Sequence, residues 1–161
     1  MLTGDDWDHV ATIRVDAAAD DAFAYMKDTR NISEWALGAL HPVEVTPETY
    51  VGDSMVDGQR VFIKVENDPQ QKHIHFRTGP GWDRLEQQIL CRIVKGDDAN
   101  GGEGSSVLSL SAHRAAAMPL PRWQQLCASH EVEMFILKNR IETKRQERDR
   151  QILSCHLEHN G

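Results

Sequence analysis

The feature that most constrains the fold is an amphipathic helix expected over about residues 121–141. At about 100° per residue, its apolar side chains return to one stripe of the helix surface. The stripe consists of Trp123, Cys127, His130, Met134, Leu137 and Ile141, with Leu126 on its flank. Pro121 suits the first turn, because its missing N–H would have no helical partner there. A helix of about 30 Å with one apolar face needs a sheet to cover that face.

Most of the chain before this helix shows the two-residue alternation of apolar and polar side chains that is typical of β-strands. The expected strands are 9–15, 43–45, 50–55, 61–65, 72–78, 83–94 and 106–114. Asp57-Gly58 is the strongest hairpin signal in the chain, and Asn67-Asp68-Pro69 predicts a further turn. Consecutive hairpins imply antiparallel pairing.

Two short helices are expected between the first and second strands. Residues 16–27 form the first, and residues 28–37 form a second short helix or turn in which Trp35 is the one large anchor. Asp28 or Asn31 suits the N-cap of the second helix, and Gly38 suits its end. The order predicts an α+β fold: a curved antiparallel sheet of about seven strands wrapped on the long C-terminal helix.

We expect a single domain over residues 1–161, with its core over about residues 9–142. The dense charges that begin at residue 143 predict either a charged extension of the helix or a frayed tail, with fraying from about residue 151. Residues 96–106 contain four glycines among polar residues and predict a mobile hairpin loop.

The charge balance narrows the class of partner. Eighteen basic and 25 acidic residues give a net charge of −7, which argues against a nucleic-acid or anionic membrane surface. No apolar run approaches the roughly 18 residues of a membrane span, and the first eight residues lack the apolar run of a signal peptide. Cys91, Cys127 and Cys155 are widely spaced and odd in number, which predicts reduced thiols in a cytoplasmic protein.

The order of the elements, together with short motifs near the N-terminus, resembles the helix-grip (START/Bet v 1-like, SRPBCC) superfamily. The motifs are the strand-to-helix segment 13–23, IRVDAAADDAF, and then Asp28, Trp35 and Gly38. The resemblance covers about residues 9–142, and the bacterial polyketide cyclase/dehydrase-like branch matches best in length and around Trp35. The rival nuclear-transport-factor-2-like fold begins with its helices and ends on strands, whereas this chain ends on its longest helix.

The resemblance implies a hydrophobic cavity between the sheet and the last helix, and it implies no fixed catalytic motif. Members of the superfamily variously carry lipids, sterols or quinones, cyclise aromatic polyketides, or act as regulators. The location of the site therefore follows from the resemblance, while its chemistry has to be sought in the residues themselves.

His130 is the first candidate for chemistry, because a purely structural stripe would usually carry Leu or Ala at this position. Facing a cavity, a neutral imidazole binds a ligand carbonyl or hydroxyl, or moves a proton as acid or base. Alternatively, His130 is a core histidine satisfied by a backbone carbonyl or by Gln87. Gln87 interrupts the apolar face of the 83–94 strand, so an inward amide needs a partner, while a register shift of one residue would expose it.

Several bulky side chains either line a cavity or simply fill the core. They are Trp35, Trp82, Trp123, Phe76, Met55 and Met134. Two pairs, Cys127 with His130 and His73 with His75, each supply two ligands where zinc needs three or four, so we expect no metal. The chain has no phosphate loop and no dinucleotide fingerprint, and we expect no cofactor.

Three functions remain open. The first is a binding protein that holds a small hydrophobic or aromatic molecule among Trp35, Met55, Phe76, Gln87, Trp123 and Met134, with His130 beside it. The second is an enzyme of the polyketide cyclase/dehydratase kind that uses His130 as acid or base. The third is a protein-interaction module with a vestigial cavity. Val132 and Ile136 lie opposite the main stripe, where they either rest on a neighbouring loop or form a homodimer patch.

Overall fold

The computed structural model describes residues 7–97 and 104–158, and it confirms the predicted helix-grip architecture. The elements are β1 (Asp8–Val15), α1 (Ala19–Lys27), η1 (Thr29–Asn31), α2 (Ile32–Trp35), β2 (Leu40–Thr46), β3 (Thr49–Asp53), β4 (Arg60–Asp68), β5 (His73–Gly79), β6 (Gln87–Lys95), β7 (Ser106–His113) and α3 (Leu120–Glu158). The strands form one seven-stranded antiparallel sheet in the order β1-β7-β6-β5-β4-β3-β2.

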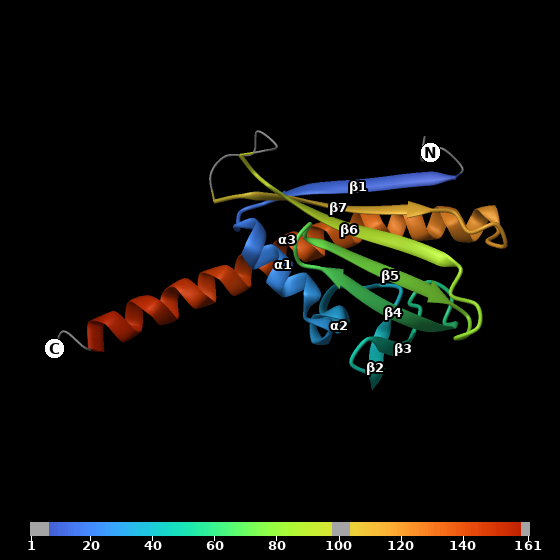
Figure 1. Cartoon of the computed structure of the whole chain (residues 1–161), viewed down its shortest axis with the longest axis horizontal. Coiled ribbons are helices and arrows are strands. Elements are labelled where there is room, and N and C mark those ends of the chain that lie inside the picture. The colour runs from blue at the N-terminus through green and yellow to red at the C-terminus, as the bar shows by residue number, and fades with distance from the viewer. Residues whose placement is uncertain (1–6, 98–103, 159–161) are drawn as a thin grey trace.

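Helix α3 runs along one face of the sheet, and the short helices α1 and α2 lie beside it (Figure 1). The first strand, β1, pairs with the last, β7, from Asp8 opposite His113 to Val15 opposite Ser106. The first and last strands of the chain are therefore neighbours in the sheet. This pairing places the inward side chains of β1 and β7 against α3.

The core forms where the α3 stripe meets the inward faces of the strands. Met134, Leu137 and Ile141 join the main cluster, which also contains Leu108 and Leu110 of β7. Nearer the start of α3, a second cluster combines Trp123 and Cys127 with Ala112. The stripe predicted from the sequence is therefore buried along its whole length.

One strand begins later than expected. β6 starts at Gln87 rather than at residue 83, because the segment after β5 folds back on itself. A Cβ atom on Gly79 would lie only 1.7 Å from the carbonyl oxygen of Arg84, so only glycine permits this close return of the chain. The prediction that residues 83–86 continue the strand is wrong for this reason.

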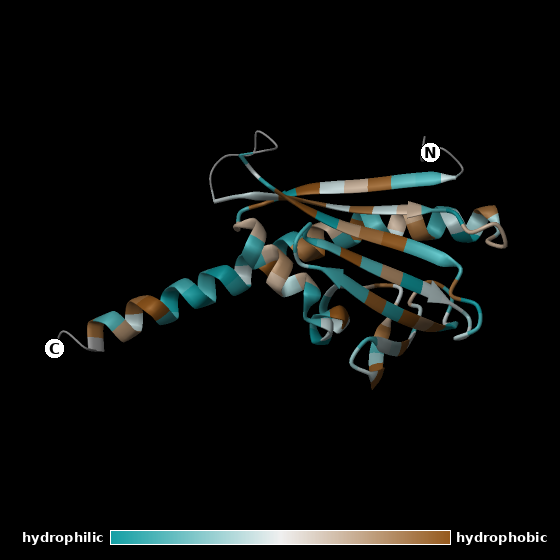
Figure 2. Cartoon of the chain, in the orientation of Figure 1, coloured by the Kyte–Doolittle hydropathy of each residue, from teal (hydrophilic) through white to brown (hydrophobic). Residues whose placement is uncertain are grey.

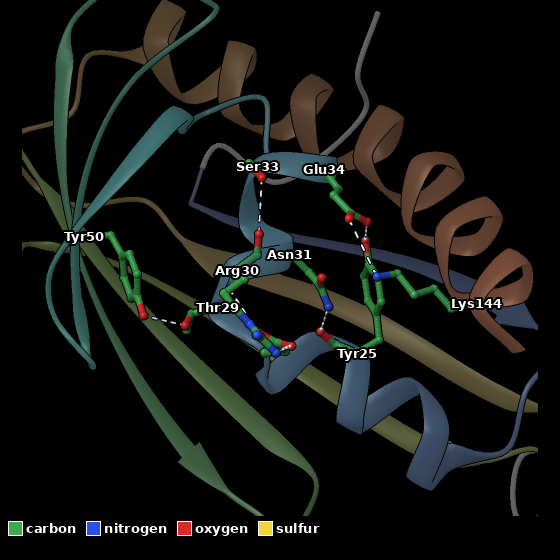
Figure 3. Close-up of polar contacts among 9 residues, drawn as sticks. Tyr25, Thr29, Arg30, Asn31, Ser33, Glu34, Tyr50 and Lys144 are labelled. Atoms are coloured by element: carbon green, nitrogen blue, oxygen red, sulfur yellow. Dashed lines mark hydrogen bonds and ion pairs between the residues drawn. The ribbon is translucent and has the colours of Figure 1, made fainter. Parts of the chain in front are cut away.

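A polar network holds the short helices in place (Figure 3). The Tyr25 hydroxyl donates to Oε2 of Glu34 at 2.9 Å, and Nζ of Lys144 on α3 lies 3.8 Å from the same carboxylate. Burial and this hydrogen bond both raise the pKa of Tyr25, so its hydroxyl stays a donor. Asn31 Nδ2 donates to the Tyr25 carbonyl at 2.9 Å, and Asp28 caps η1 through the Arg30 N–H at 3.2 Å, which confirms the expected Asp28 cap.

Helix α3 is 39 residues long, or about 58 Å, and its C-terminal part projects beyond the sheet (Figure 1). The extension is mostly hydrophilic, with a hydrophobic band near its end (Figure 2). Arg145 donates to the Asp16 carbonyl, and Arg148 pairs with Asp21 of α1. The expectation of fraying from residue 151 is wrong as far as Glu158, since the helix continues that far.

Residues 1–6, 98–103 and 159–161 lie outside the described part of the chain. The predictions for the two ends and for the 96–106 loop fall partly on these residues. Across the part of the chain that is described, no helix is both long enough and apolar enough to span a membrane.

Candidate functional site

A cavity of about 340 Å³ lies between the sheet and the first half of α3. Strands β4 to β6 form its floor, and the α2–β2, β3–β4 and β7–α3 connections surround its mouth. Ile32, Ile63 and Ile89 contribute apolar surface from three different elements. The sheet and helix therefore enclose a largely apolar space rather than a solid core at this end of the molecule.

Trp35 and Phe76 form an aromatic wall of the cavity. Their ring centroids lie 5.9 Å apart with an interplanar angle of 72°, which is an edge-to-face arrangement. Trp35 is placed by α2 and Phe76 by β5, so the wall joins the short helices to the sheet. A flat ligand would meet aromatic surface on this side.

His130 lines the cavity from α3 and is only 4% exposed. Within residues 7–97 and 104–158, its Nδ1 atom has no hydrogen-bond partner. Burial, and secondarily the neighbouring His9 ring at 6.1 Å, lowers the pKa of His130 to about 4. The imidazole is therefore neutral at physiological pH and retains an unused polar atom.

Glu133, one helical turn after His130, also lines the cavity and is 4% exposed. Its Oε1 accepts a hydrogen bond of 2.8 Å from the Leu37 N–H, and the carboxyl group also accepts from the Gly38 N–H. Burial raises the pKa of Glu133 to about 8, although these two backbone donors act in the opposite direction. At neutral pH the group is mostly a carboxylic acid, which can donate as well as accept a hydrogen bond.

Gln87 is buried at the start of β6, so of the two alternatives left open by the sequence, the inward one is observed. Its amide nitrogen donates to the His113 carbonyl at 2.8 Å, and its amide oxygen accepts from the Ala115 N–H at 3.1 Å. Both ends of the amide are thus used by backbone groups, at the end of β7 and in the β7–α3 connection. Gln87 lines the cavity, but its hydrogen bonds stabilise the cavity wall.

The mouth of the cavity is polar. Arg122, near the start of α3, places its Nε atom 3.0 Å from Oδ2 of Asp57 in the β3–β4 connection. Its Nη2 atom is 3.4 Å from the Ser54 hydroxyl. Arg60 and Arg84 line the same opening. A ligand that enters this cavity therefore passes a charged rim before it reaches the aromatic wall.

No protein-family model matches this chain, and a search of curated proteins finds no relative. Solved structures do match it. A START superfamily protein from Mycobacterium smegmatis superposes with a TM-score of 0.64 at 17% identity, covering 85% of this chain and 98% of that one. The Zhui aromatase/cyclase from Streptomyces sp. R1128 superposes with a TM-score of 0.59 at 15% identity, covering 88% and 94%. The chain has the helix-grip fold.

A third structure with the same fold is BexL, a di-domain aromatase/cyclase of the BE-7585A biosynthetic pathway. It superposes with a TM-score of 0.59 at 17% identity over 84% of this helix-grip chain and 46% of the BexL chain. Identities this low establish the shared fold alone, so the chemistry of this cavity has to be argued from its own residues.

Of the seven residues that the sequence proposes for binding or catalysis, four line the helix-grip cavity: Trp35, Phe76, Gln87 and His130. Three others lie elsewhere. Trp123 and Met134 are buried in the core clusters, and Met55 is 57% exposed on the β3–β4 connection. The roles of all seven in binding or catalysis stay predictions.

The position of the cavity explains this division. The α3 residues that line it are Arg122, Leu126, Ser129, His130 and Glu133. At about 100° per residue, His130 belongs to the apolar stripe, and the other four lie beyond one edge of it, on the flank that carries Leu126. Trp123 and Met134 occupy the middle of the stripe, which the strands cover. Glu133 was missed in the sequence because an isolated glutamate on a helix usually faces water; its position seven residues after Leu126 was the available signal.

The two candidate metal pairs remain pairs. His73 and His75 have ring centroids 6.3 Å apart on β5, and Cys127 is buried beside Trp123. Within the described ranges, no three His, Cys, Asp or Glu side chains are grouped so that they could hold a metal ion.

Proposed function

We propose that the cavity binds a small hydrophobic or aromatic molecule, of the lipid, quinone or polyketide kind. The observation that carries this proposal is the unpaired Nδ1 of His130 beside a largely apolar cavity of about 340 Å³. A buried polar atom without a partner costs free energy. A ligand hydroxyl or carbonyl that reached His130 would remove this cost, and the aromatic wall of Trp35 and Phe76 would cover the rest of the ligand.

The volume and composition of the cavity support the same proposal. Ligand pockets are typically about 300–1,000 Å³, mostly apolar, and carry a few polar groups that orient the ligand. Here those polar groups are His130 and Glu133, both neutral near pH 7. Neutral groups in an apolar space favour an uncharged end of the ligand at this depth. The shared fold with a START superfamily protein and with aromatase/cyclases adds general support.

The test is a thermal-shift panel with dodecanoate, menadione and naringenin, because a ligand that binds only the folded state raises the melting temperature. Ser129→Phe would place a large side chain in the cavity. We expect it to reduce the shift, and the apparent affinity obtained from the shift should fall at least tenfold. Gln125→Phe, one turn earlier on the exposed side of α3, is the matched control and should retain the shift. No response from any compound would favour the interaction-module alternative.

A second function, acid–base catalysis on a carbonyl compound, is favoured by the position of His130 and Glu133 one helical turn apart on the wall of the same cavity. A neutral imidazole can accept a proton from carbon next to a carbonyl, while a protonated carboxylic acid can donate to the carbonyl oxygen. The C–H bond breaks, its electron pair moves toward the oxygen, and the enol forms without net change in charge at the site. Cyclisation and dehydration of polyketide-like substrates both use such a step.

Deuterium exchange into the methyl group of acetophenone, followed by NMR in D₂O, tests this function directly. We expect catalysed exchange with the unaltered protein and at least a hundredfold slower exchange with His130→Gln. The variant should still give a thermal shift with menadione, because the glutamine amide can also hydrogen-bond a carbonyl and the aromatic wall is unchanged. Exchange at the uncatalysed rate with the unaltered protein would reject catalysis of this kind and leave the binding proposal standing.

A further inference from the structure

Helix α3 exposes large apolar side chains on the side that faces away from the sheet. Phe135 and Leu153 are each 65% exposed, and Val132 and Leu157 are also exposed. Phe135 and Leu153 are 18 residues apart, which is five helical turns, so they lie on the same side of the helix and about 27 Å apart. We call this side, with Val132, Leu157 and the neighbouring Lys138 and Asp149, the outer face of α3.

The outer face does not belong to the cavity. The α3 residues that line the cavity, such as Leu126 and Ser129, point to the other side of the helix. Ile136, which the sequence places with Val132 opposite the main stripe, either on a neighbouring loop or in a homodimer patch, instead packs against the main core cluster. The exposed apolar residues next to Val132 are therefore Phe135 and, five turns further on, Leu153.

The spacing of these residues makes the outer face complementary to itself in the antiparallel direction. Phe135 and Leu153 are equally far from Lys144, nine residues before and nine after it. Val132 and Leu157 are also nearly equally far from Lys144, and both lie on the same edge of the face. When the α3 helices of two copies are placed antiparallel with their Lys144 residues at the same level, Phe135 of one copy meets Leu153 of the other, and Val132 meets Leu157. A twofold axis then repeats both contacts.

The charges on the other edge of the face match in the same alignment. Lys138 lies six residues before Lys144 and Asp149 lies five after it, so each Lys138 meets the Asp149 of the second copy. Within one chain, Lys138 pairs with Glu142 and donates to the Arg14 carbonyl of β1 at 3.2 Å, and Asp149 lies 3.4 Å from Arg145. The antiparallel alignment adds an opposite charge to each of these pairs, whereas a parallel alignment would place Lys138 against Lys138.

The projecting part of α3 provides the room that this alignment needs. Beyond Arg150 the side chains of residues 151–157 are all exposed, and the extension is free of the sheet (Figure 1). The sheet of the second copy would lie on the far side of its own α3, alongside this extension. We propose that the protein forms a twofold dimer in which the outer faces of two α3 helices pack antiparallel. The twofold axis crosses the helices at the level of Lys144, whose side chain points the other way, toward Glu34.

The first experiment measures the mass in solution by sedimentation equilibrium. We expect the unaltered protein to be dimeric at tens of micromolar, and Phe135→Glu and Leu153→Glu each to be monomeric. Val43→Glu is the matched control, because Val43 is also 65% exposed but lies on β2. A monomeric unaltered protein, or a dimer that survives both glutamate substitutions, would overturn the proposal. Far-UV circular dichroism establishes that each variant is folded.

The second experiment tests the antiparallel register. Lys138→Glu alone and Asp149→Lys alone each place like charges together twice in the dimer, so both variants should dimerise more weakly. A mixture of the two variants forms heterodimers in which one of the two ion pairs has its charges exchanged and the other is unaltered. Both pairs are then attractive, so the mixture should recover the dimer. If both variants dimerise as strongly as the unaltered protein, or if the mixture recovers nothing, the register is not the one proposed.

Discussion

His130 and Glu133 lie one helical turn apart, and burial moves their pKa values in opposite directions. The cause is the same for both, because a low-dielectric environment disfavours whichever form carries the charge. The pKa of His130 falls to about 4, and that of Glu133 rises to about 8. Between these values both side chains are uncharged, so the deep part of the cavity offers hydrogen bonds without a formal charge.

The stability of the protein should therefore depend on pH through Glu133. Its folded pKa of about 8 lies above the ordinary value of 4.5, so the stability that its protonated form contributes is lost as the pH rises between these values. His130 acts in the opposite sense, and only as the pH falls from 6.5 to about 4. Between pH 6.5 and 8, we expect the free energy of unfolding to fall by at most about 1.4 kcal/mol per pH unit.

Urea denaturation at several pH values in this window checks the expectation. Glu133→Gln cannot titrate, so its free energy of unfolding should change less with pH than that of the unaltered protein. Glu147→Gln, at an exposed position on α3, is the control and should keep the original slope. Parallel slopes for all three proteins would show that Glu133 is not the titrating group.

At the scale of elements, the connections rather than the strands control access to the cavity. The 54–59 connection between β3 and β4 is held on one side by Arg122 of α3. On the other side, the Met55 N–H donates to the Leu37 carbonyl at 2.9 Å. Gly58 takes a φ of +69°, which allows the connection to turn tightly between these two attachments. Loss of one attachment should leave a flap that opens more often.

Arg122→Met is expected to loosen this connection. The substitution keeps much of the side-chain length and removes the ion pair with Asp57, so amide hydrogens of residues 54–59 should exchange faster by at least threefold. Ligand association and dissociation should both accelerate. Arg60→Met is the matched control, because Arg60 also lines the mouth but its guanidinium is exposed and lies 3.6 Å from Asp53. Hydrogen-exchange mass spectrometry that finds equal rates in both variants would contradict the role of Arg122.

The order and type of the elements could be predicted from the sequence because each depends on local periodicity. The stripe from Trp123 to Ile141 and the alternation in β5 and β7 are properties of short windows. The offset of the cavity toward Leu126 and Glu133 depends instead on how strands distant in sequence cover the stripe. The fold-back at Gly79 likewise depends on a contact with Arg84 that no pattern indicates. The architecture could thus be predicted from local periodicity, whereas the side chains that reach the cavity depend on packing between residues distant in sequence.

At the scale of the whole molecule, the cavity and the outer face of α3 occupy separate regions. The cavity lies between the sheet and the first half of α3, whereas the extension contacts the body mainly through Lys144, Arg145 and Arg148. Residues 151–157 are exposed and contribute little to the core. The two properties should therefore be separable by truncation.

A chain that ends at Arg150 should keep its fold and its ligand affinity, because no cavity residue is removed. It should lose dimerisation, since Leu153 and Leu157 are absent. Dimerisation stabilises by mass action, so the melting temperature of the full chain should rise with protein concentration and that of the truncated chain should not. Differential scanning calorimetry over a hundredfold range of concentration measures this; a more than twofold change in menadione affinity after truncation would instead mean that the extension supports the cavity.

From Arg122 to Glu158, α3 contains neither glycine nor proline, so it has no residue at which a helix readily bends. Ser129 beside the cavity and Leu157 near the far tip are consequently joined by one stiff rod of about 42 Å. A fluorophore attached to the tip would keep a constant separation from a fluorescent ligand, and energy transfer between them would act as a molecular ruler for occupancy.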